Sequence, residues 1–137
     1  VDPLAGTWKL DLARTHYGGG ADQRKEETFV WESSKGEVKC TIRSLRSDGR
    51  ALVGSFTAAY DGKPYATSGI PDVDQVSLRR VDESIVDATF SYKGKPVFAY
   101  RALRSRNGET LIIVSVEPAT RAVLHSVVVY ERPRPIR

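Results

Sequence analysis

The stretch Ile85–Val116, IVDATFSYKGKPVFAYRALRSRNGETLIIVSV, decides the fold class of this chain. Apolar and polar residues largely alternate within it, and the β-rich runs are separated by Lys93-Gly94 and Asn107-Gly108. A dipeptide that ends in Gly and lies between two alternating runs is typical of a β-hairpin turn. This stretch therefore predicts three consecutive antiparallel strands.

Turn signals of the same kind recur along the rest of the chain, at Lys35-Gly36, Asp48-Gly49 and Asp61-Gly62. No window between them shows a helical period over more than two turns. The expected strands cover residues 4–12, 24–32, 37–46, 51–60, 64–67, 75–81, 85–92, 96–105, 110–116 and 123–132, the fifth and sixth of which could form one interrupted strand.

A long antiparallel meander leaves two exposed edges, and closure into a barrel removes both of them. We therefore predict an all-β fold, a single antiparallel meander β-barrel of about eight to ten strands. Residues 1–132 form the barrel domain in this interpretation. Residues 133–137 form a basic, Pro-rich tail.

The composition limits the kinds of protein that this chain can be. The 137 residues are 40% hydrophobic and 28% charged, which suits one domain with a real core. No apolar run approaches the ~18 residues of a membrane span. The net charge of +4 comes from basic residues scattered over many strands, and no nucleic-acid-binding motif is present. We expect no nucleic-acid partner and no membrane span.

Cysteine and histidine are scarce. Cys40 is the single cysteine, so neither an intramolecular disulfide nor a thiolate metal cluster is possible. His16 and His125 lie far apart without ligand spacing, and no cofactor motif appears, so we expect neither a metal nor a cofactor. The chain contains no Met and opens at Val1, which fits an exported protein, periplasmic or secreted, after signal-peptide removal; a trimmed chain would look the same.

Pairing rules predict which side chains point into the barrel. A two-residue turn at Asn107-Gly108 places Arg101 opposite Val114 and apolar residues around it. The same turn type in the preceding hairpin places Arg101 opposite Val86. An odd-length loop in the hairpin before that places Arg80 opposite Val86. Arg80 and Arg101 are therefore predicted to flank Val86 on the inner face.

An inward arginine costs several kcal/mol unless it is paired or hydrated. Two adjacent arginines suit a carboxylate or phosphate inside the barrel, because the guanidinium fork matches such groups. The alternative is that both side chains lie near the barrel mouth, reaching water or pairing with Asp or Glu. Both interpretations stay open at this point.

The inner face is also expected to be aromatic. A three-residue loop at 47–49, with Gly49 in the left-handed conformation, pairs Cys40 with Phe56 and makes Cys40 a buried, inert thiol. Inner aromatic side chains either line a cavity for an apolar ligand or simply fill the barrel. The register predicts five of them, Phe56, Tyr60, Tyr65, Phe90 and Tyr92. Trp31 is a further candidate, and so is Tyr130 if the 118–121 loop has odd length.

The same register predicts an apolar outer patch. This patch would suit a dimer contact or another interaction surface. Its members are Phe98, Tyr100, Leu111 and Ile113.

Acid–base candidates are few. His125 faces inward if the 118–121 loop has even length and outward if it has odd length. His16 lies in a Gly-rich connection, expected over one end of the barrel. In an enzyme, either histidine or Tyr130 would serve as the acid–base group beside Arg101.

Two segments resemble the calycins, the superfamily of lipocalins and fatty-acid-binding proteins. Gly6-Thr7-Trp8-Lys9-Leu10 resembles the Gly-x-Trp signature that opens their first strand, and residues 128–132 are similar to the last strand of the fatty-acid-binding proteins. The resemblance implies that Trp8 plugs the closed end of the barrel, that Arg132 is a candidate to pack across it, and that Tyr130 points inward.

The chain departs from the fatty-acid-binding proteins in two places. Residues 13–23 are too short for their two-helix lid, and Val128 stands where their ligand-binding Arg would be. A lipocalin-type barrel, like that of small exported lipocalin-like proteins of soil bacteria, fits better.

These observations predict a barrel that holds a hydrophobic or amphipathic small molecule, including a carboxylate-bearing one, with Arg80 and Arg101 at the charged end. The alternative is a barrel enzyme, an isomerase, lyase or hydrolase. The protein would be a monomer or a homodimer.

Overall fold

The computed structural model describes residues 2–16, 24–120 and 122–133. Its ten strands form one closed antiparallel barrel, as predicted, in which each strand pairs with its neighbours in the sequence and β1 pairs with β10. The strands are β1 (Gly6–Leu10), β2 (Arg24–Ser34), β3 (Glu37–Arg46), β4 (Ala51–Ala59), β5 (Asp61–Ser68), β6 (Gln75–Asp82), β7 (Ile85–Tyr92), β8 (Lys95–Arg104), β9 (Thr110–Val116) and β10 (Val123–Glu131).

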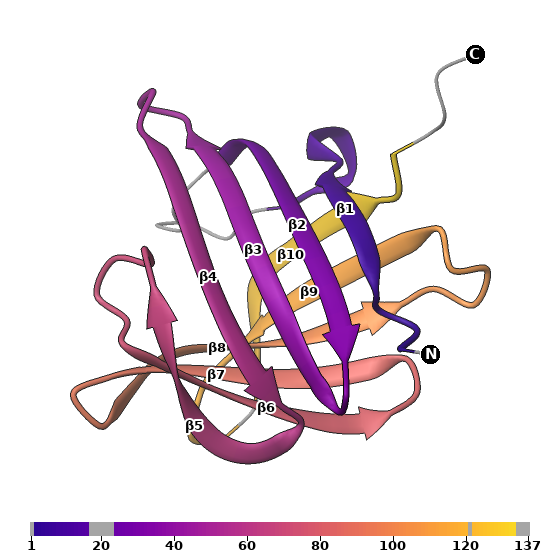
Figure 1. The fold of residues 1–137 in the computed structure, drawn as a ribbon. Helices are drawn as coiled ribbons and strands as arrows, with labels where there is room; N and C mark the ends of the chain where they lie inside the picture. Colours follow the sequence, from indigo (N-terminus) through magenta and orange to yellow (C-terminus); the bar gives the residue numbers. More distant parts are fainter. Residues whose placement is uncertain (1, 17–23, 121, 134–137) are drawn as a thin grey trace.

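Strands β2, β3 and β4 form one wall of the barrel, and β7, β8 and β9 run across them on the other side (Figure 1). A short 3₁₀ helix, Leu12–Arg14, follows β1. No helix in the described part of the chain is long and apolar enough to cross a membrane.

Three of the predicted hairpin registers are confirmed. Cys40 lies opposite Phe56, and Gly49 has a φ of +91° in the three-residue loop. Arg80 lies opposite Val86, and Arg101 lies opposite Val114. In these hairpins the local turn chemistry and the apolar pattern indicate the same pairing.

The predicted register of β7 against β8 is wrong. Phe90 lies opposite Phe98, whereas Ser91 lies opposite Pro96, so Val97 is an extra residue in β8. A β-bulge of this kind exchanges the two faces of the strand beyond it. Consequently, Arg101 faces outward and its neighbour Tyr100 faces inward.

The same bulge removes the predicted outer patch. The side chains of Tyr100, Leu111 and Ile113 are buried, with 9%, 1% and 8% of their surface exposed. Phe98 is half-exposed, but its ring stacks on that of Phe90 at 4.5 Å between centroids. These four residues belong to the interior and its rim, and not to an outer contact surface.

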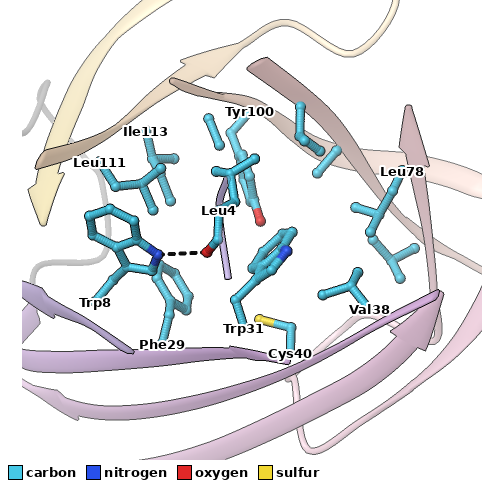
Figure 2. Packing of buried hydrophobic residues seen from close by; sticks show 14 of the residues in the cluster. Leu4, Trp8, Phe29, Trp31, Val38, Cys40, Leu78, Tyr100, Leu111 and Ile113 are labelled. Atoms are coloured by element: carbon cyan, nitrogen blue, oxygen red, sulfur yellow. Dashed lines mark hydrogen bonds between the residues drawn. The ribbon is translucent and has the colours of Figure 1, made fainter. Parts of the chain in front are cut away.

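The closed end of the barrel is filled by the N-terminal segment. Figure 2 shows Leu4 in the centre of the core, between Trp8 and Trp31. The indole N–H of Trp8 donates to the carbonyl of Leu4 at 2.9 Å, and both side chains are fully buried. The guanidinium of Arg132 lies 4.1 Å from the centroid of the Trp8 ring, so the expected packing of Arg132 across Trp8 is confirmed.

The first and last strands close the barrel through a short ladder. Lys9 pairs with Glu131 and Leu10 with Tyr130. Beyond the 3₁₀ helix, the backbone of His16 pairs again with that of Val127. Closure therefore depends on residues from the two ends of the chain.

Candidate functional site

The other end of the barrel contains a cavity of about 510 Å³. This volume lies within the range of small-molecule pockets, and most of the lining is apolar. The lining residues are Arg24, Glu27, Phe29, Ile42, Arg46, Leu52, Ile70, Phe90, Val97, Phe98, Ala99, Tyr100, Ile113, Ser115, Val116, Pro118, Leu124, Ser126, Val128 and Tyr130.

Two of the aromatic residues predicted to line a cavity do so, namely Phe90 and Tyr130. Trp31 and Phe56 are buried, but they fill the core beside the cavity, with their ring centroids 6.4 Å apart. The barrel is thus filled at one end and hollow at the other.

Three predicted tyrosines lie away from the cavity wall. Tyr65 donates to the carboxylate of Asp61 at 2.7 Å, close to the surface. Tyr92 is 40% exposed at the tip of the β7–β8 hairpin. Tyr60 packs against the core at the closed end. Phe29, Phe98 and Tyr100 contribute to the wall instead.

Arg80 points inward as predicted, but at the closed end. Its Nη2 lies 3.0 Å from the Oδ1 of Asp2, and its guanidinium lies 4.2 Å from the centroid of the Tyr60 ring. Tyr60 donates to Asp2 at 2.5 Å and accepts a hydrogen bond from the Trp31 indole at 2.9 Å. This arginine is paired with a carboxylate, which is the alternative that the sequence left open.

The environment of Asp2 keeps its carboxylate charged. Burial by itself raises the pKa of Asp2, but hydrogen bonds from Tyr60 and the Leu4 amide, together with Arg80, lower it by more. The cluster therefore stabilises the closed end, and the cation that the described residues contribute to it, Arg80, is already paired with Asp2.

Arg101 does not line the cavity, contrary to prediction. It forms a two-point ion pair with Asp87, with N–O distances of 2.7 and 3.0 Å, and its side chain is 41% exposed. The hydrogen bond from Arg101 to Asp87 raises the pKa of Arg101. Arg101 lies outside the cavity because the bulge in β8 exchanges the two faces of this strand.

A different polar cluster faces the cavity. Glu27 is buried on β2, where its carboxylate accepts a short hydrogen bond from the phenol of Tyr130. The Nε of Arg24 lies 3.0 Å from the other carboxylate oxygen of Glu27. A register shift between Arg24 and Glu26 turns Arg24 onto the same face, directly opposite Arg46 of β3.

Sequence reasoning missed this cluster, although part of its signal was present. Glu27, Phe29 and Trp31 follow one another at every second position, so they share one face of the strand. The inward position of Glu27 could therefore have been predicted from the sequence. Nothing in the local sequence marks the bulge that brings Arg24 inward. Pro96 was a usable signal for the bulge in β8, because proline, which lacks an N–H, is confined to strand edges, starts and bulges.

The predicted acid–base candidates are placed as follows. Tyr130 lies in the cavity wall, as the calycin resemblance implied. His16 is exposed and does not line the cavity. His125 lies within β10, but its side chain falls outside the described part of the structure.

Cys40 lies among apolar side chains. It is a free thiol with no exposed surface, and burial raises its pKa strongly. A thiol in this environment is a poor nucleophile. In the described ranges, no group of three or more His, Cys, Asp or Glu is placed to hold a metal ion.

Comparison with known proteins found no relative of this chain. No protein-family model matches the chain. No curated protein and no solved structure matches it significantly either. The function is therefore inferred from the cavity itself, which lies in a closed barrel that is compatible with the calycin fold.

Proposed function

We propose that this protein is a lipocalin-like carrier that binds one small hydrophobic or amphipathic molecule inside the barrel. The observation that carries this proposal is the cavity of about 510 Å³, whose lining is mainly apolar and includes several aromatic rings. Pockets of this size and character bury most of the surface of a small ligand.

The rim of the cavity supports the same proposal. Val97, Phe98 and Leu124 line the cavity and are 47%, 42% and 46% exposed. Apolar side chains grouped around one opening suit the entry of an apolar molecule, which would cover them on binding.

The Gly6-x-Trp8 arrangement, with Arg132 packed over the indole, supports calycin membership. The enzyme alternative would depend on Tyr130 and Glu27, which meet in the cavity wall. A buried carboxylate needs a hydrogen-bond partner in any fold, so this bond is expected whether or not the protein is an enzyme. We therefore favour a carrier. Export and oligomeric state stay predictions.

The test uses N-phenyl-1-naphthylamine, a neutral fluorescent probe. We expect saturable binding with one probe per chain. Ser115, which lines the cavity, is then changed to Phe, and we expect the affinity to fall by roughly tenfold or more, because the new ring occupies part of the space.

The control is Val114→Phe, which adds a ring at the adjacent position on the other face of β9, opposite the outward Arg101. This variant should bind the probe as the wild type does. Equal losses in both variants, or no saturable binding by the wild type, would contradict the proposal.

A further inference from the structure

We propose that Arg46 binds a single anionic head group, a carboxylate, at the mouth of the cavity, so that the ligand lies with its charged end on β2 and β3 and its apolar part inside. This inference rests on the proposed carrier function and specifies the chemical class of its ligand.

The first observation is that two cations lie opposite each other. Arg24 and Arg46 are directly paired across β2 and β3, and both line the cavity. Side chains at such positions start about 4.5–5.5 Å apart, and like charges there repel each other. An anion between them would convert this repulsion into attraction.

The second observation is that the available carboxylate does not neutralise both arginines. The Oε2 of Glu27 pairs with Arg24, and its Oε1 accepts the hydrogen bond from Tyr130. Among the described side chains, the two arginines and one carboxylate of Arg24, Glu27 and Arg46 leave one positive charge. A monoanion such as a carboxylate balances it, whereas a phosphate dianion exceeds it.

The third observation is that Arg46 has unused hydrogen-bonding capacity. Its Nη1 is buried and has no hydrogen-bond partner in the described residues. The Oγ of Ser44, two positions earlier on the same face of β3, is also buried without a partner there. A buried donor without a partner is costly, so such groups call for an explanation.

The apolar wall continues directly from this polar end. Phe29 follows Glu27 on the inner face of β2, and its ring lies 4.7 Å from that of Tyr130. The guanidinium fork is suited to grip both oxygens of a carboxylate. A molecule with one carboxylate and a compact apolar or aromatic body therefore fits the cavity in a single orientation.

The experiment compares two probes of nearly equal shape, 1-naphthaleneacetate and 2-(1-naphthyl)ethanol, by calorimetric titration at pH 7. We expect the wild type to bind the carboxylate roughly tenfold or more tightly than the alcohol, since a charged hydrogen bond is lost in the alcohol. We expect Arg46→Gln to abolish this preference while its affinity for the alcohol stays as in the wild type.

The matched control is Arg43→Gln, the same change at an exposed position of the same strand. This variant should keep the preference. If Arg46→Gln retains the preference, or if the wild type binds both probes equally, the anion site is wrong while the carrier function stands. If the wild type binds neither probe but binds N-phenyl-1-naphthylamine, the anion site is wrong; if it binds none of the three, the carrier function itself is wrong.

Discussion

At the scale of single residues, Gly6 shows why the Gly-x-Trp pattern takes this form. Gly6 has a φ of +127°, and a Cβ atom at this position would lie 2.4 Å from the Nη1 of Arg132. The same nitrogen donates to the carbonyl of Ala5, while its guanidinium covers Trp8. A side chain at position 6 would therefore strain the backbone and displace Arg132 from Trp8.

We expect Gly6→Ala to lower the free energy of unfolding by about 2–4 kcal/mol, measured by urea denaturation with tryptophan fluorescence. The control is Gly36→Ala, where φ is +80° but nothing lies within 4 Å of the added atom. That variant should cost about 1 kcal/mol, for backbone strain alone. Equal costs in the two variants would contradict the role given to Arg132.

At the scale of elements, the N-terminal segment acts as a plug that a polar cluster holds in place. Asp2 has only 3% of its side chain exposed, yet it meets Arg80 of β6 and Tyr60 beside β4. Tyr60 connects it further to Trp31 of β2. One hydroxyl group thus links the segment to β2 and to the end of β4.

We expect Tyr60→Phe to destabilise the protein by about 1–3 kcal/mol in urea denaturation, because the Trp31 N–H loses its acceptor and Asp2 loses a donor. Tyr65→Phe removes an equivalent hydroxyl that bonds Asp61 near the surface, and it should change the stability much less. A similar loss in both variants would show that the cluster does not anchor the plug.

At the scale of the whole molecule, the hydrogen-bonded ladders between neighbouring strands differ greatly in length. The β2–β3 ladder runs without a gap from the Ser34–Glu37 pair to Glu26–Leu45. By contrast, β4 and β5 pair only at Ser55–Ser68 and Phe56–Thr67. Parts of a fold with short ladders and exposed side chains open at lower free energy than the rest.

We expect hydrogen exchange followed by mass spectrometry to show this difference. Amides of β3 should exchange roughly a hundredfold or more slowly than those of β5. The long β7–β8 ladder provides an internal reference that should behave like β3. Equal protection of β3 and β5 would mean that the barrel opens only as one unit.

The sequence by itself determined the all-β class, the closed meander and the hairpin registers at Cys40–Phe56 and Arg80–Val86. These features depend on turn residues and on two-residue alternation, which are local properties. The calycin resemblance also indicated the packing of Arg132 on Trp8, since the residues that carry it lie at the two ends of the chain.

Only the tertiary structure decided which arginines face the cavity. One bulge in β8 turned Arg101 outward, and another in β2 turned Arg24 inward beside Arg46. A bulge is fixed by how neighbouring strands fit around the whole barrel, and a single extra residue exchanges the two faces of a strand. Alternation along the chain therefore predicts that a strand has an inner face, whereas closure of the barrel selects the residues on it.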